Sequence, residues 1–292
     1  MKTIALCQLN PLSRNPENNF SVIEQVIDKY SKKGIQLFIF PEDFLFGILR
    51  NKSDIFNAGR LFQSYLNKFS ILSKKYKVDI IPGSFPMLKN NEVYNTTLYI
   101  DKDGDVKNQY SKTNLWLSER KYYSSGNSSL KSFESVLGKT VQIICWDLMD
   151  HNLFEEAIRQ NTDWIIISSF WTINRSKELI RERGRTKNTY SIPLKRAERI
   201  SSILETRSTE YNMGIIFCNM GGIHSYLSSN NTKELAISAG NSQIIIPLDG
   251  VRKSVKNNKE QILICDIPSI KDYLSDHEIL YGRREDILNK KC

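Results

Sequence analysis

Apolar and polar residues follow one another along the first part of the chain in an order that predicts alternating strands and helices. Short apolar runs at residues 4–9, 37–40 and 78–81 are typical of buried strands. Between them, apolar residues at helical spacing predict helices over about residues 16–30 and 59–76. The order strand, helix, strand, helix, strand favours an α/β fold.

The same order returns in the second half of the chain, after a predicted hairpin of residues 93–100 and 106–110. A buried strand over residues 141–144 precedes an amphipathic helix, and a long helix is predicted over about residues 194–211. Further strands are predicted at residues 164–168, 215–218, 234–238, 243–247 and 261–266. No linker separates the halves, so we expect one domain over residues 1–292, with a core of about residues 3–268, a tail of residues 269–292, two sheets inside and helices outside.

Composition places the chain among ordinary water-soluble proteins. Hydrophobic residues make up 40% and charged residues 25%, and no apolar run approaches the ~20 residues that span a bilayer. The five cysteines are odd in number and form no C-x-x-C pair, which argues against a disulfide framework and a zinc site. The N-terminal residues lack a signal-peptide pattern. We therefore expect a cytoplasmic protein with no membrane contact and no metal.

Basic residues give the chain a net charge of +9, and most of the excess lies in one stretch. Residues 175–199 hold nine Lys/Arg against three Glu, a surplus of +6. This stretch can attract an anionic substrate or line a subunit interface, and a non-catalytic, nucleic-acid-binding protein is the alternative from another class. Since no nucleic-acid motif accompanies the charge, we expect no nucleic-acid partner.

Cys145 stands where a predicted strand turns toward a helix. Helix N–H groups pointing at a thiol favour the thiolate, so Cys145 is a candidate nucleophile. The alternative is a structural cysteine, since free cysteines are among the most buried residues.

Glu42 and Lys112 also lie at or just after the ends of predicted strands, where ligands bind in α/β folds. A carboxylate in a desolvated pocket can take the proton of a thiol, and a lysine can stabilise both a thiolate and the oxyanion of a tetrahedral intermediate. Glutamate, lysine and cysteine thus make a self-consistent acyl-transfer site without histidine.

Three separated sequence blocks match a known family in order and spacing. They are Phe-Ile-Phe-Pro-Glu42, Tyr-Ser-Lys112-Thr-Asn-Leu and Ile-Ile-Cys145-Trp-Asp-Leu. The chain resembles the carbon–nitrogen hydrolase (nitrilase) superfamily, which carries a Glu–Lys–Cys triad on a four-layer αββα sandwich. The resemblance implies a hydrolase of a small linear amide or N-carbamoyl compound that needs no cofactor and forms a homodimer or higher homo-oligomer.

Further positions match the family or suggest a pocket. Glu119 resembles a second glutamate that positions the lysine and the substrate, and Gly126 resembles the glycine that closes the same loop. We expect the Trp146 backbone N–H to serve an oxyanion hole, while Trp171 and Tyr123 are candidate pocket aromatics. Arg207 and Glu210 resemble the family's arginine-to-glutamate helix and are expected to form a structural ion pair. Residues 239–242 and 247–250 resemble the family's glycine–serine strand pair.

Two alternatives concern the residues around the nucleophile. The Cys-Trp pair also occurs in true nitrilases, which convert a nitrile to acid and ammonia, but those typically have glutamate where this chain has Asp147. His151 lies six residues after Cys145 and is a rival base, although it is expected to face away. His151-Asn152 also replaces the usual Pro-Glu, which puts the shape of the substrate site in question.

Overall fold

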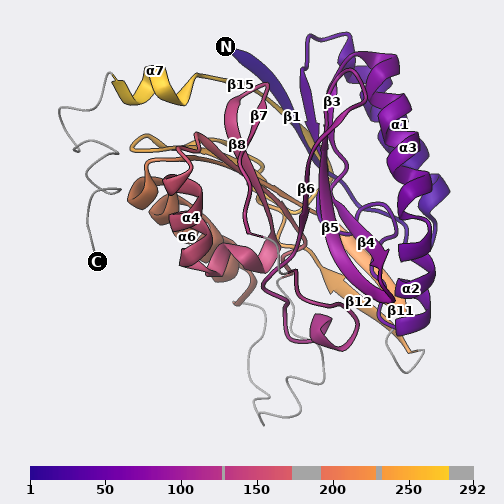
Figure 1. Ribbon diagram of the computed structural model, residues 1–292. Coiled ribbons are helices and arrows are strands. Elements are labelled where there is room, and N and C mark those ends of the chain that lie inside the picture. The colour runs from indigo at the N-terminus through magenta and orange to yellow at the C-terminus, as the bar shows by residue number, and fades with distance from the viewer. Residues whose placement is uncertain (127–128, 173–191, 228–231, 276–292) are drawn as a thin grey trace.

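The structure is a computed structural model that describes residues 1–126, 129–172, 192–227 and 232–275. Two twisted sheets face each other, and the helices cover their outer faces (Figure 1). This αββα arrangement confirms the predicted fold class.

The first sheet is built mainly from the N-terminal half of the chain. Its strand order is β15-β1-β2-β3-β5-β4, with β6 paired to β5. Strands β1, β2 and β3 are parallel, and the others join them in antiparallel pairs. The strands are β1 (Lys2–Gln8), β2 (Leu37–Ile39), β3 (Asp79–Ile81), β4 (Ser84–Lys89), β5 (Glu92–Ile100), β6 (Val106–Ser111) and β15 (Gln261–Ile267).

The second sheet comes from the second half of the chain and has the order β14-β13-β10-β9-β8-β7. Strands β8, β9 and β10 are parallel, and all three point their carboxyl ends the same way. The strands are β7 (Phe133–Ser135), β8 (Gly138–Ile144), β9 (Trp164–Ser169), β10 (Gly214–Asn219), β13 (Gln243–Ile246) and β14 (Gly250–Ser254). A separate two-stranded sheet pairs β11 (Ile223–Leu227) with β12 (Lys233–Ile237).

Helices lie on both outer faces (Figure 1). α1 (Pro16–Ser31), α2 (Lys52–Arg60) and α3 (Phe62–Tyr76) cover the first sheet, and α4 (His151–Arg159) and α6 (Ile192–Tyr211) cover the second. A short helix, α7 (Ile270–Ser275), follows β15. The Asn15 side chain accepts from the Asn18 N–H at the start of α1, where Pro16 fits because its nitrogen has no hydrogen to satisfy.

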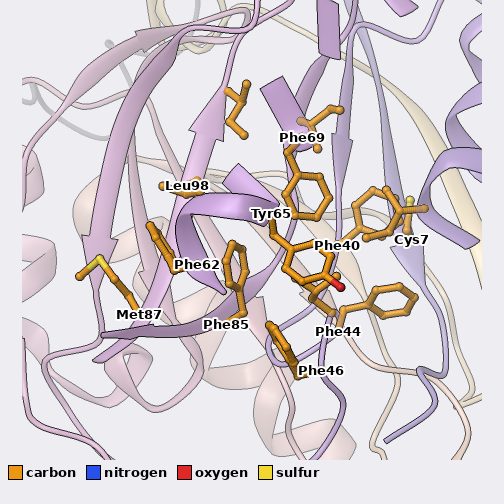
Figure 2. Close-up of a cluster of buried hydrophobic side chains, with 14 of the residues drawn as sticks. Cys7, Phe40, Phe44, Phe46, Phe62, Tyr65, Phe69, Phe85, Met87 and Leu98 are labelled. Atoms are coloured by element: carbon orange, nitrogen blue, oxygen red, sulfur yellow. The ribbon is translucent and has the colours of Figure 1, made fainter. Parts of the chain in front are cut away.

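Alternation of side chains along the strands builds three apolar layers. In β2, Phe38 faces the outer helices, while Leu37 and Ile39 face the second sheet. In β9, Ile165 and Ile167 face α4 and α6, while Trp164 and Ile166 face the first sheet. Figure 2 shows the aromatic-rich outer layer under α3, with Tyr65, Phe69 and Phe85 among its buried side chains.

The structure corrects several predicted boundaries. The helix expected over residues 59–76 is α3, which begins at Phe62, whereas α2 before it was not predicted. The two helices divide at Leu61, where a tighter turn forms. Gly59, the predicted start of that helix, lies near the end of α2, where α2 packs against β4. A Cβ on Gly59 would lie only 3.0 Å from the Leu88 backbone nitrogen, so the close packing favours glycine. β4 itself was not predicted, because Pro82, Gly83 and Pro86 read as turn residues.

Candidate active site

Glu42, Lys112 and Cys145 meet at one end of the space between the sheets. Glu42 follows β2 in the first sheet, Lys112 follows β6 in the same sheet, and Cys145 follows β8 in the second sheet. Their exposed fractions are only 2%, 1% and 7%. Since a buried lysine or glutamate is costly unless it is paired, this placement requires specific partners.

The Lys112 ammonium group forms buried ion pairs with two glutamates at once. Its Nζ donates to Glu42 Oε1 at 2.8 Å and lies 2.8 Å from Glu119 Oε2. Burial alone would lower the pKa of Lys112, but the two carboxylates raise it well above its usual value. The two carboxylates thus favour the charged form of Lys112.

Groups that the sequence did not reveal fix the orientation of Glu42. The Asn95 side chain, on β5, donates to Glu42 Oε1 at 2.9 Å. The backbone N–H of Phe170, just after β9 in the opposite sheet, donates to Oε2 at 2.9 Å. A backbone donor has no sequence signature, and a single Asn in a strand has almost none.

Cys145 opens a 3₁₀ turn, Cys145–Met149, and has a left-handed backbone with φ of 46°. Only a few per cent of residues other than glycine adopt such a φ, and strain of this kind is common at active sites. The expected thiolate is wrong for the free protein: burial and then the Glu42 charge raise the pKa of Cys145 well above its usual value, although Lys112 opposes them. The regular helix α4 begins only at His151, so its N-terminus does not lie directly behind the thiol.

Asp147, of the Cys-Trp-Asp block, holds the nucleophile turn against the loop after Lys112. Its Oδ2 accepts from the Ile144 N–H at 3.0 Å and from the Tyr110 hydroxyl at 2.9 Å. Its Oδ1 accepts from the Asn114 N–H at 2.7 Å and from the Thr113 hydroxyl at 3.1 Å. Burial raises the pKa of Asp147 to about 6, so at neutral pH it is mainly an ionised acceptor for these donors.

Glu119 lies at the start of a 3₁₀ turn, Glu119–Lys121, and is 8% exposed. Besides contacting Lys112, its Oε2 accepts from the Trp116 N–H at 2.7 Å. The loop closes at Gly126, whose N–H donates to the Lys112 carbonyl at 2.8 Å. A Cβ on Gly126 would stand 2.2 Å from the Ser111 oxygen, which explains the glycine there.

Three of the four tryptophans in the chain cluster beside the nucleophile. The Trp146 ring packs against Trp171 with centroids 5.3 Å apart and against Trp116 at 4.1 Å. The sequence singled out Trp146 and Trp171 but not Trp116, which is 40% exposed. Trp116 follows Lys112 by four residues in a loop, and its position could be inferred only from the placement of that loop.

Tyr123 and a residue missed by the sequence, Asp43, lie in the same buried cluster. Their exposed fractions are 8% and 7%. Asp43 has a left-handed backbone, with φ of 57°, and its N–H donates to the Ser84 carbonyl. Burial, and then the Glu42 charge, raise the pKa of Asp43 to about 8. Burial likewise raises the pKa of Tyr123, and Asp43 is the strongest of the charges acting on it.

Other candidates lie outside this cluster. His151 is exposed at the start of α4, whereas the residues of the cluster are buried. Arg207 and Glu210 form the expected helix-face ion pair at 2.9 Å. Most of the basic stretch of residues 175–199, including Arg181, Arg183 and Arg185, and also Cys292, lies outside the described residues. In the described ranges no group of three or more His, Cys, Asp or Glu side chains could hold a metal ion, and no helix is long and apolar enough to cross a membrane.

Comparison with known proteins identifies the family. The family model for carbon–nitrogen hydrolases matches residues 3–271 of the chain. The chain belongs to the carbon–nitrogen hydrolase family. The predicted membership and the predicted class of enzyme are thereby confirmed.

Individual relatives of this carbon–nitrogen hydrolase support the same family assignment. It is 30% identical over 252 residues to the 2-oxoglutaramate amidase of Bacillus subtilis, covering 84% of this chain and 83% of that protein. It is 26% identical to the deaminated glutathione amidase of Dictyostelium discoideum, over 94% of this chain and 90% of that one. A cysteine-to-alanine variant of the amidase from Nesterenkonia sp. AN1 in complex with butyramide has the same fold, with a TM-score of 0.73 and 17% identity, over 100% of this chain and 97% of that one.

Proposed function

We propose that this protein hydrolyses the non-peptide C–N bond of a small linear amide or N-carbamoyl compound through a thioester on Cys145. The observation that carries the proposal is the position of Lys112, which pairs with Glu42 and Glu119 inside the buried cluster that contains the Cys145 thiol. Two relatives are named as amidases, one of 2-oxoglutaramate and one of deaminated glutathione.

In the proposed acylation step, Glu42 removes the thiol proton as the sulfur attacks the amide carbon. The raised pKa of Cys145 makes a base necessary at this moment, because little thiolate exists beforehand. The negative charge that leaves Glu42 appears on the substrate oxygen, where Lys112 Nζ and the Trp146 N–H stabilise it. Glu42 then passes the proton to the leaving nitrogen as the C–N bond breaks.

In the proposed deacylation step, Glu42 activates a water that attacks the thioester. The oxyanion forms again beside Lys112, and its collapse breaks the C–S bond and releases the acid, while Glu42 returns the proton to the sulfur and restores the thiol. Glu119 keeps Lys112 in place through the 2.8 Å contact and anchors the Trp116 loop. The three clustered tryptophans form one apolar wall beside the acyl group.

Turnover tests this proposal directly. The native protein, Cys145→Ala and Glu42→Gln would be incubated with matched amides, N-carbamoyl compounds and nitriles, and ammonia and acid measured. We expect release from an amide or carbamoyl compound by the native protein alone. Turnover of nitriles with amides left intact would favour the nitrilase alternative, and equal turnover by Cys145→Ala would overturn the proposal.

A homodimer or higher assembly and a cytoplasmic location also remain proposals, supported by the family relationship and the cysteine usage. Light scattering after size exclusion would decide the first, since a mass near 33.8 kDa would mean a monomer.

A further inference from the structure

Ser169, the last residue of β9, carries a hydroxyl group that is fully buried and unbonded. Its exposed fraction is 0%, and its Oγ makes no hydrogen bond of normal geometry within the described part of the chain. The neighbouring Ser168 shows the usual arrangement, because its Oγ donates to the Phe40 carbonyl at 3.1 Å. Buried hydroxyls are nearly always bonded, and the exceptions include groups with a catalytic role.

The pairing of β8 with β9 brings Ser169 beside the nucleophile. Ile144, the last residue of β8, stands opposite Ser168 in this parallel pair. Cys145 and Ser169 are the next residues along the two chains, so both lie at the same carboxyl edge of the sheet. The 3₁₀ turn that Cys145 opens also packs against β9.

The Ser169 side chain lies on the face of the sheet where Cys145 packs. Side chains alternate along a strand, and the Ser168 side chain reaches toward the first sheet. Ser169 therefore shares the opposite face with Ile165 and Ile167, which belong to the same buried apolar cluster as Cys145. Strand register and side-chain alternation thus place the unbonded hydroxyl on the side of the reactive sulfur.

The hydroxyl also acts on the charge state of the sulfur. Burial raises the pKa of Cys145 most and the Glu42 charge raises it further, whereas Lys112 and the polar Ser169 side chain lower it. A neutral thiol is a poor hydrogen-bond acceptor, and a thiolate is a much better one. Catalytic hydrogen bonds that are poorly aligned in a free enzyme commonly tighten when the reaction begins. A donor without a partner beside the thiol is thus placed to bond the sulfur as it becomes negative.

We propose that Ser169 is a further catalytic residue, whose hydroxyl donates a hydrogen bond to the Cys145 sulfur while that atom carries negative charge. This role rests on the proposed function. In acylation, Glu42 removes the thiol proton and a sulfur electron pair forms the C–S bond, while the hydroxyl stabilises the charge on sulfur until that bond is complete. In deacylation, the C–S bond breaks and the hydroxyl stabilises the departing sulfur until Glu42 returns the proton. Ser169 keeps its own proton throughout.

Ser169→Ala tests this role by removing the hydroxyl alone. We expect kcat/KM for an amide that the native protein hydrolyses to fall by roughly 10- to 100-fold, the range of a hydrogen bond to a charged group. The midpoint of urea unfolding should not fall, because the resting protein loses no hydrogen bond and no longer buries an unpaired hydroxyl. A serine that served only the fold would give the reverse, lower stability with little change in turnover.

Alkylation of Cys145 gives a second measurement that needs no turnover. The rate of modification by iodoacetamide at one fixed pH, mapped to Cys145 by mass spectrometry, reports how readily the thiolate forms. Ser169→Ala should slow it by roughly 3- to 10-fold, since fewer thiols ionise while each thiolate becomes more nucleophilic. Ser169→Thr keeps a hydroxyl in a residue type that strands favour, and it should retain most of both rates.

Ser208→Ala is the matched control. It removes a buried hydroxyl that donates to the Met213 carbonyl at 2.7 Å, at the end of α6. This variant should be less stable than the native protein, because a buried hydrogen bond is lost, and should turn over amides and react with iodoacetamide at the native rates.

Native rates of turnover and alkylation in Ser169→Ala, or equal losses in Ser169→Ala and Ser169→Thr, would overturn the role of Ser169 and leave the proposed hydrolysis intact. Failure of the native protein to hydrolyse any amide or carbamoyl compound would overturn the proposed function and the catalytic role together, even where alkylation still depended on Ser169.

Discussion

Lys112 balances the negative charges of the two buried glutamates in the candidate site. It is the only cation bonded to Glu42 and Glu119 among the described residues, and all three side chains are almost fully buried. Removing one partner of a buried ion pair is far more costly than removing the whole set, because uncompensated charge stays behind.

Lys112→Met should therefore abolish turnover and lower the free energy of unfolding by about 3–5 kcal/mol. Adding Glu42→Gln and Glu119→Gln to this variant should recover much of the stability and none of the activity. Urea unfolding and amide turnover measure the two effects. A triple variant as unstable as Lys112→Met would mean that Lys112 acts through packing and not through charge.

Asp43 gives a pH dependence whose sign can be stated. Its pKa in the folded protein is about 8, above the unfolded value, so the folded state holds the proton more tightly. This contribution to stability is fully present below about pH 4 and is lost as the pH rises toward 8.

Asp43→Asn does not titrate, so its stability relative to the native protein should increase steadily between pH 4 and pH 8. Urea unfolding of both proteins at several pH values in this range measures the difference, and a constant offset from the new amide does not affect its slope. A difference that stays flat or shrinks with rising pH would contradict the raised pKa.

At the scale of elements, the loop between β6 and Gly126 decides where Lys112 stands. Gly126 packs against the Ser111–Lys112 peptide so closely that a Cβ would overlap the Ser111 oxygen at 2.2 Å. A side chain there must displace the end of β6, which leads directly into Lys112.

Gly126→Ala should lower kcat/KM by at least about 100-fold, since small displacements of catalytic groups have effects of this size. Gly34→Ala is the control: it lies after α1, with nothing within 4 Å of its added Cβ, and its φ of 75° costs only about 1–2 kcal/mol. The control should be less stable but active. Equal activity of the two variants would show that the contact at Gly126 tolerates displacement.

The sequence predicts some helices and strands correctly and misses others. Long periodic segments such as α1, β8 and β9 follow the predicted positions, because burial of one face dominates their sequence pattern. Three features could not be predicted, because each depends on contacts between segments that are separated in the sequence. They are the division of the helices at Leu61, the strand β4 and the pairing of β12 with β11. The predicted site residues meet in space, but Asn95, the Phe170 N–H and Asp43 join them only through folding.

On the scale of the whole molecule, the candidate site exists only when both sheets are in place. Glu42 comes from one sheet and Cys145 from the other, and the Phe170 N–H after β9 reaches across to Glu42. Further bonds join the sheets nearby, including Ser168 Oγ to the Phe40 carbonyl at 3.1 Å and Gln142 to the Leu98 carbonyl at 3.1 Å. Relative movement of the sheets would separate base from nucleophile.

In the proposed reaction Cys145 forms a thioester with the acyl half of the substrate, and Glu42 is the base in this step. Intact-mass spectrometry after rapid mixing with an amide that the protein hydrolyses would detect this intermediate. We expect an acyl adduct on the native protein that maps to Cys145, is absent from Cys145→Ala and forms far more slowly in Glu42→Gln. An adduct that persists in Cys145→Ala, or one that forms at the native rate in Glu42→Gln, would contradict it.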